Sequence, residues 1–184
     1  SWVDCLSERE ETAEAVALGN ARAIRERLAG FDVPYIWISQ TNLKDMAPGN
    51  WLDFNRRHYP HGFEKLLRRL RAMGFKPGLW IAPFWLFNRA RRNVAENKEN
   101  LVRTRAGAIL ERPLEWWEFI RTGRDKLRLY WLDGSHPRSR AFIKRVFRAY
   151  RRLGIRYYML DFLGCGLERA VWDKAKTWTQ ADRD

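Results

Sequence analysis

Short apolar runs alternate along this chain with segments of helical periodicity, and this alternation restricts the fold more than any other feature of the sequence. The clearest apolar runs are residues 33–39, 76–83 and 156–162, and a shorter run at residues 2–5 fits the end of a further strand. Apolar runs of this length are typical of strands that are buried on both faces. Strands that alternate with helices form a parallel sheet with crossover helices. The sequence therefore predicts an α/β protein.

The segments between the runs predict three helices, each ended by a glycine. Ser7 and Glu10 have the spacing of a capping box at the start of the first helix. The second helix is predicted to begin at Phe63, and Ser135 is predicted to cap the third one just before Pro137. The glycines that end these helices are Gly30, Gly74 and Gly154.

Two long connections separate the predicted elements. Residues 40–61 are rich in Asn, Pro and Gly and exceed the length of a plain connection, which indicates a binding loop. Residues 84–126 are irregular, aromatic and charged; we expect one or two short helices there that cover the strand ends, followed by an extended run at residues 127–133. A doubly wound sheet and part of a (β/α)8 barrel both fit this order. A glycine-rich nucleotide fingerprint is absent from the sequence, which favours the barrel.

Asp161 is a lone carboxylate at the end of the last apolar run. Burial of a carboxylate is costly unless hydrogen bonds or charges compensate for it. In parallel α/β proteins, catalytic and ligand-binding groups lie at the C-terminal ends of the strands. The strand by itself therefore leaves two interpretations of Asp161 open, a functional carboxylate and a cap of the next turn.

The charge and composition exclude few classes of protein. The net charge is +13, from 35 Lys and Arg against 22 Asp and Glu. A basic surface can bind nucleic acid, but here the basic residues recur at helical spacing, which favours solvated helix faces and no nucleic-acid partner. No apolar run approaches the roughly 20 residues of a membrane span, so we expect no membrane partner. The two cysteines, Cys5 and Cys165, form neither a disulfide framework nor a metal site and suit a reduced, cytoplasmic protein.

Several segments together resemble the motifs of one family of known proteins. Residues 74–84, Gly-Phe-Lys-Pro-Gly-Leu-Trp-Ile-Ala-Pro-Phe, are similar to that family's "GFKPGLWIAPF". Residues 50–51 and 59–63 are similar to its "GDW…FPxGM" stretch, and residues 132–137 to "LDLTHPE". Residues 158–162, Tyr-Met-Leu-Asp-Phe, are similar to "YLKLDF", which ends in the family's nucleophile. The matches occur in the same order along the chain as in that family, and the chain thus resembles the melibiase-type α-galactosidases of glycoside hydrolase family 36.

The resemblance implies a (β/α)8 TIM barrel, of which this chain holds roughly the first four strand–helix units. It implies a retaining glycosidase of carbohydrate metabolism that acts on an α-galactoside or a related oligosaccharide, without metal or cofactor. Asp161 is then the nucleophile by position. Trp80 also fits the barrel core and His136 an exposed helix start, so both alternatives stay open. The substrate-binding residues implied by position are Trp80, Ser39, Gln40, Trp51 and His136.

The chain departs from the family pattern at two places. Ser39 and Gln40 stand where the family has aspartates, and they offer neutral groups to a sugar hydroxyl. Met159 stands where the family has a lysine that helps to keep the nucleophile ionised. Three functions therefore stay open: an α-galactosidase, a related α-glycosidase or transglycosylase of other specificity, and a non-catalytic carbohydrate-binding relative.

The family's acid/base carboxylate lies on a strand later than the nucleophile, and the acidic residues after Asp161 are read as solvated charges. Position 1 is Ser, and no closing element is recognisable near residue 184. We expect residues 1–184 to form a single catalytic-barrel fragment, truncated at both ends, inactive alone and prone to associate because of its open sheet edges. A homo-oligomer of the full-length protein is compatible with this reading.

Overall fold

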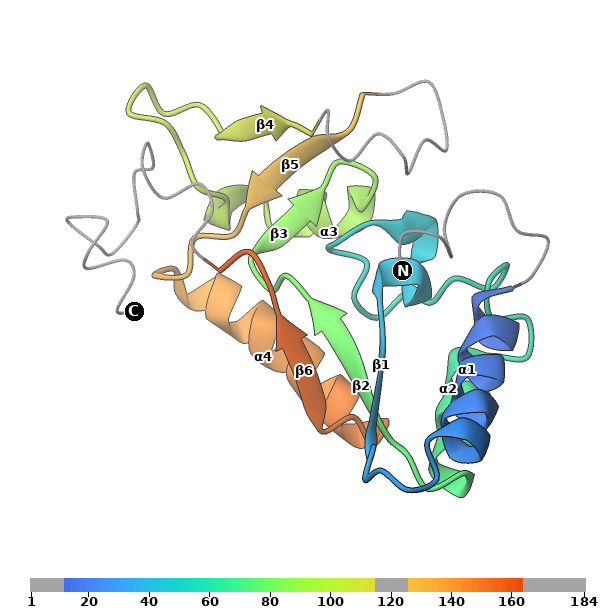
Figure 1. Ribbon diagram of the computed structural model, residues 1–184. Coiled ribbons are helices and arrows are strands. Elements are labelled where there is room, and N and C mark those ends of the chain that lie inside the picture. Colours follow the sequence, from blue (N-terminus) through green and yellow to red (C-terminus); the bar gives the residue numbers. More distant parts are fainter. Residues whose placement is uncertain (1–11, 115–125, 164–184) are drawn as a thin grey trace.

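A three-stranded parallel sheet forms the centre of the molecule. The computed structural model describes residues 12–114 and 126–163, so the strand expected at residues 2–5 lies outside the described residues. The strands are β1 (Tyr35–Ile38), β2 (Lys76–Ile81) and β6 (Tyr157–Leu160), in the order β1–β2–β6 (Figure 1). All pairings are parallel, which confirms the parallel sheet predicted from the alternating pattern.

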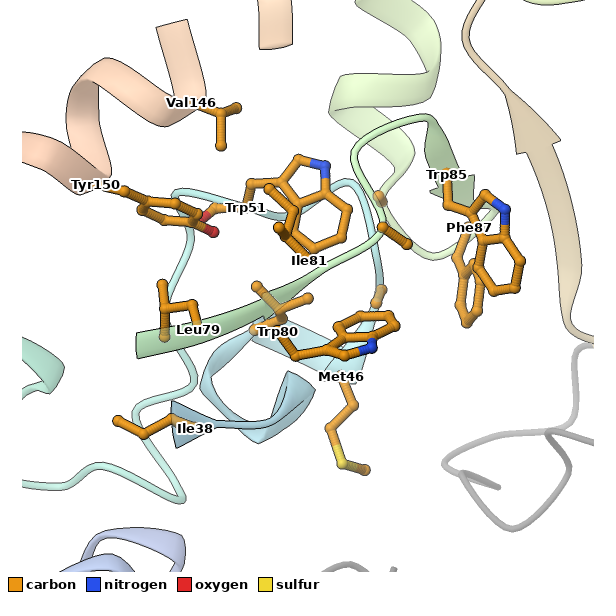
Figure 2. Close-up of a cluster of buried hydrophobic side chains, with 14 of the residues drawn as sticks. Ile38, Met46, Trp51, Leu79, Trp80, Ile81, Trp85, Phe87, Val146 and Tyr150 are labelled. Atoms are coloured by element: carbon orange, nitrogen blue, oxygen red, sulfur yellow. The ribbon is translucent and has the colours of Figure 1, made fainter. Parts of the chain in front are cut away.

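Three helices accompany this sheet: α1 (Ala13–Arg27), α2 (Phe63–Ala72) and α4 (Pro137–Arg152). Helix α4 runs along β2 and β6, and α1 and α2 lie side by side next to β1 (Figure 1). Alternate residues of β2 point to opposite faces. Leu79 and Ile81 point toward Val146 and Tyr150 of α4, whereas Trp80 lies on the other side of the strand (Figure 2). The helices thus cover one face of the sheet, and Trp80 belongs to the opposite face.

A second, antiparallel sheet lies at the C-terminal end of the parallel strands. Its strands are β3 (Trp85–Phe87), β4 (Glu111–Pro113) and β5 (Arg128–Trp131), in the order β3–β5–β4 (Figure 1). The segment between β3 and β4 contains the short helices α3 (Arg91–Glu96) and η3 (Lys98–Asn100), which confirms the short helices expected there. The strands β3 and β4 were not predicted, because three residues are too few for a periodic pattern.

The predicted cap of the third helix is wrong, and the cap predicted for the first helix, Ser7, lies outside the described residues. Helix α1 begins at Ala13, after Thr12, whose side chain accepts a 3.2 Å hydrogen bond from the backbone of Ala15. Helix α4 is capped by His136, whose Nδ1 accepts a 3.1 Å bond from the backbone of Arg138. Proline occupies the first helical position, so the residue directly before it becomes the cap, and Ser135 lies one position too early.

The β6 strand is less buried than its apolar sequence predicted. Tyr158 packs against Phe147 of α4, with ring centroids 5.0 Å apart. Met159 and Leu160, however, are 38% and 49% exposed. Within the described residues β6 pairs with β2 alone, so its other edge has no neighbouring strand to cover these side chains. The expectation of burial on both faces is therefore corrected for this strand.

Arginine side chains of two helices donate hydrogen bonds to backbone carbonyls at the C-terminal ends of later helices. Arg25 of α1 donates from Nε to the carbonyl of Met73, at the end of α2, over 2.9 Å. Arg71 of α2 donates from Nη1 to the carbonyl of Leu153, at the end of α4, also over 2.9 Å. The residues that follow, Gly74 and Gly154, have φ values of 82° and 83°, the left-handed conformation that favours glycine. These are two of the glycines predicted to end helices.

Candidate active site

The C-terminal ends of the parallel strands meet at one edge of the sheet, and most of the predicted site residues lie there. Ser39 and Gln40 directly follow β1, Trp80 is near the end of β2, and Asp161 directly follows β6. The backbone N–H of Asp161 donates to the carbonyl of Ile81 over 3.0 Å, so the chain stays aligned with β2 as it leaves the strand. The fold therefore brings Trp80 and Asp161 together from positions 81 residues apart.

Two hydrogen bonds hold the Asp161 carboxylate. Its Oδ1 accepts from the backbone N–H of Phe162 over 2.8 Å, and its Oδ2 accepts from the indole Nε1 of Trp80 over 2.9 Å. The side chain is half-buried. An anchored and accessible carboxylate at a strand end is suited to act as a nucleophile or to bind a hydroxyl group.

Phe162 adopts a conformation that is unusual for a residue with a side chain. Its φ is 52°, in the left-handed region. The turn places the Phe162 ring flat against Trp85, with centroids 4.0 Å apart and planes at 15°, and edge-on to Trp80 at 6.4 Å. Aromatic contacts of this kind offset part of the backbone strain. Neither Phe162 nor Trp85 was identified as a site residue from the sequence, although Phe162 ends one of the motifs described above and Trp85 directly follows another.

Trp80 is packed among other side chains rather than presented to solvent. It is 6% exposed. Trp51 lies 6.3 Å from it, measured between ring centroids, and Met46 lies close to it in Figure 2. Trp51 itself is 1% exposed and anchors the long loop in the core. The segment predicted as a binding loop is thus held against the sheet by buried side chains.

Buried amides follow β1. The short helix η1 (Gln40–Asn42) begins directly after Ser39, which is half-buried. Gln40 and Asn42 are both 1% exposed, and their amide atoms have no hydrogen-bond partner within residues 12–114 and 126–163. Burial of an amide without a partner is costly, so these groups have donors and acceptors to spare for a ligand or a water. Asn42 was missed from the sequence, although it belongs to the same polar run as Ser39 and Gln40.

His136 has a structural role at the start of α4. Its Nδ1 is occupied by the helix cap, which leaves Nε2 as the ring nitrogen that can meet a ligand. In the part of the chain that the structure describes, no hydrogen bond joins His136 to Asp161 or Trp80.

Over residues 12–114 and 126–163, no group of three or more His, Cys, Asp or Glu side chains is arranged to hold a metal ion. No helix among the described residues is long and apolar enough to cross a membrane.

Comparison with known proteins adds an independent line of evidence. No family model matches the chain. The chain is 29% identical, over 126 residues, to the mouse protein named myogenesis-regulating glycosidase, an alignment that covers 67% of this chain. It superposes on an α-galactosidase from Thermus thermophilus in complex with stachyose, with a TM-score of 0.60, 26% identity and 78% of this chain covered. These relatives are glycosidases.

More distant structures share the fold of these glycosidases. A family 31 sulfoquinovosidase from E. rectale matches 98% of this chain with a TM-score of 0.66 and 16% identity, which supports the fold alone. The chain spans 16% of the length of the mouse glycosidase and 28% of the Thermus α-galactosidase. The chain is therefore similar to part of these glycosidases and shares their mixed α/β fold with a parallel sheet.

Proposed function

We propose that this chain is part of the (β/α)8 catalytic barrel of a retaining α-glycosidase, with an α-galactoside as substrate and Asp161 as the nucleophile. The observation that carries the proposal is the carboxylate of Asp161, anchored at both oxygens and positioned at the C-terminal end of a parallel strand. The likeness to the Thermus α-galactosidase supports the galactoside as substrate class.

In the proposed reaction, an oxygen of Asp161 attacks the anomeric carbon while the bond to the aglycone oxygen breaks. A second carboxylic acid, from outside the residues described, donates a proton to the departing oxygen. The product of this step is a glycosyl ester of Asp161. The second carboxylate then takes a proton from a water molecule, which attacks the same carbon and releases the sugar with its configuration retained.

The buried amides after β1 suit the binding of a neutral sugar. Gln40 and Asn42 have hydrogen-bonding groups to spare, and an amide both donates and accepts. Sugar hydroxyls also donate and accept hydrogen bonds, so these amides can bind a sugar without a charged group. Ser39, Trp51 and His136 are further proposed contacts with the substrate. Gln40, Asn42 and Trp51 are each 1% exposed, so contact with them requires the loop to open.

Two alternatives to an α-galactosidase stay open, and each is favoured by particular residues of this chain. Neutral groups at Ser39 and Gln40, in place of family aspartates, favour a related α-glycosidase or transglycosylase of other specificity. Met159, apolar and 38% exposed next to Asp161, favours a non-catalytic carbohydrate-binding relative, because it replaces the cation that assists the family's nucleophile.

The test uses the full-length protein and p-nitrophenyl α-galactoside. We expect hydrolysis, with the α-anomer of galactose formed first in the NMR spectrum. Asp161→Asn should lower kcat/KM by at least about a thousandfold, because loss of a nucleophile removes the covalent step. The matched control is Asp32→Asn, which changes an exposed carboxylate before the start of β1, away from the C-terminal strand ends, and should leave activity unchanged.

The alternatives give different results in the same assay. Turnover of an α-glucoside or α-xyloside, but not of the galactoside, would support a different specificity. Binding of galactose in calorimetry without turnover of any of these substrates would support the non-catalytic relative. Unchanged turnover in Asp161→Asn would show that Asp161 is not the nucleophile.

A further inference from the structure

We propose that Trp80 is a positioning residue for Asp161, which acts through its indole N–H and not by contact between its ring and the sugar. The inference rests on the proposed role of Asp161 as nucleophile. Its starting point is the 2.9 Å hydrogen bond from Trp80 Nε1 to Asp161 Oδ2. The sequence predicted instead that Trp80 binds the substrate.

The ring of Trp80 has little surface to offer to a sugar. Stacking on a sugar requires an accessible aromatic face, and Trp80 is 6% exposed. Trp51 and Phe162 both lie close to the ring, at 6.3 and 6.4 Å between centroids. The part of Trp80 that meets the candidate site is therefore the edge that carries Nε1.

The two donors on Asp161 define the plane of its carboxylate. The Phe162 backbone N–H holds Oδ1 and the Trp80 indole holds Oδ2, so rotation about the bond between Cβ and the carboxylate carbon would break both bonds. Each oxygen keeps a second lone pair, which is the one available for attack on a carbon atom. A nucleophile that is held in this way needs no reorientation before it reacts.

The rigidity of the donor distinguishes this arrangement from a lysine beside the nucleophile. Trp80 pairs with Met159 in the register of β2 and β6, so the apolar Met159 lies next to the indole. The indole is fixed on a central strand by packing on both sides, whereas a lysine has a flexible stem. The indole N–H is a donor at every pH, so it fixes the carboxylate without a titration of its own.

Replacement of Trp80 by Phe separates the two roles. Phe retains an aromatic face in the same space but cannot donate a hydrogen bond. If Trp80 positions Asp161, kcat for p-nitrophenyl α-galactoside should fall by about 10- to 100-fold, the range expected for loss of one hydrogen bond to a charged group. KM should change by less than about threefold, because the substrate contacts stay in place.

Trp131→Phe is the matched control in the full-length protein. Trp131 is also buried, at 5% exposed, but it lies on β5 in the antiparallel sheet. The same loss of an indole there should leave kcat and KM unchanged. A rise in KM with unchanged kcat in Trp80→Phe would overturn the proposal and support contact with the sugar. Equal losses of kcat in both variants would also overturn it, because the effect would then come from the core.

A second measurement does not depend on activity. In the protein labelled with ¹⁵N at the indoles, the Trp80 resonance is identified by its absence from Trp80→Phe. Asp161→Ala removes the acceptor, so the Trp80 indole proton should move upfield and exchange with solvent at least about tenfold faster. An unmoved resonance with unchanged exchange would overturn the proposal whatever the enzyme does. If Asp161→Asn is inactive but Trp80→Phe is fully active, only the positioning role fails; if Asp161→Asn is active, both proposals fail.

Discussion

The hydroxyl of Tyr150 donates a 2.6 Å hydrogen bond to the backbone carbonyl of Trp51. Tyr150 lies on α4 and Trp51 on the long loop after β1, and both are buried. Burial raises the pKa of Tyr150, so its hydroxyl keeps its proton at neutral pH and remains a donor. This bond joins α4 to the loop that packs against Trp80.

Tyr150→Phe should therefore lower the free energy of unfolding by about 1–3 kcal/mol, because the Trp51 carbonyl would be left buried without a partner. Chemical denaturation measures the change. Tyr158→Phe is the control, since the Tyr158 hydroxyl makes only a long, 3.3 Å bond to Ile155 at a half-buried position. Equal effects of the two substitutions would contradict the role given to the buried bond.

Gly78 is required by the side chain on the neighbouring strand. A Cβ atom at Gly78 would overlap the ring of Tyr157 and lie 2.9 Å from its carbonyl oxygen. Gly78→Ala should destabilise the protein by about 1–3 kcal/mol, the range for overpacking in a core. Gly19→Ala is the matched control: no atom lies within 4 Å of its added Cβ, and Gly19 is inside α1. That variant should gain about 0.5–1 kcal/mol, since alanine favours a helix interior. A loss at both positions would contradict the steric explanation.

His58 should make stability depend on pH. Burial, and to a lesser extent the neighbouring Arg57, lower the pKa of His58 from its ordinary value of 6.5. The unfolded chain therefore binds a proton before the folded protein does as the pH falls. The contribution of His58 to the free energy of unfolding is complete above the pKa that His58 has in the unfolded chain. It declines below that pH, until His58 of the folded protein also becomes protonated. Urea denaturation at about pH 7.5 and pH 5 should show the decline, and His58→Gln should reduce it. A decline of equal size in that variant would assign it to other groups.

Arg71 should stabilise the end of a helix other than its own. Arg71→Met keeps most of the aliphatic stem but loses the bond to the Leu153 carbonyl, so we expect a loss of about 0.5–1 kcal/mol. Arg68→Met is the control, because Arg68 is exposed on the same helix and no hydrogen bond is found for it in the described residues. Hydrogen exchange should show faster opening of the last turn of α4 in Arg71→Met alone.

The sequence predicted the parallel sheet well because its signals are local. Apolar runs and the glycines after the helices identify strands and helix ends within a few residues, and β1, β2 and β6 fall inside the predicted runs. The antiparallel sheet was missed because its strands pair with segments that are distant in sequence. Trp85 lies opposite Trp131, and no local sequence pattern near either residue predicts that pairing.

The sequence predicted which residues belong to the candidate site, but it did not predict the contacts between them. Asp161 and Trp80 were both selected from the sequence, yet the hydrogen bond between them depends on the register of β2 and β6. The left-handed turn at Phe162 could not be anticipated, because phenylalanine rarely adopts it and the contacts that help to stabilise it here come from Trp80 and Trp85, which are distant in sequence. The assignments of Asp161, Trp80, Ser39, Gln40, Trp51 and His136 to a sugar site remain predictions.

The arginines at the helix ends also bear on the order in which the chain assembles. Each arginine precedes the carbonyl that it binds, Arg25 by 48 residues and Arg71 by 82. During synthesis on the ribosome, the donor therefore emerges before the helix end that needs it. When the end of α2 is synthesised, Arg25 of α1 is already available to bind it, and Arg71 of α2 is likewise available for the end of α4. The helical layer can consequently be built in one direction, from the N-terminus onward, as the polypeptide lengthens.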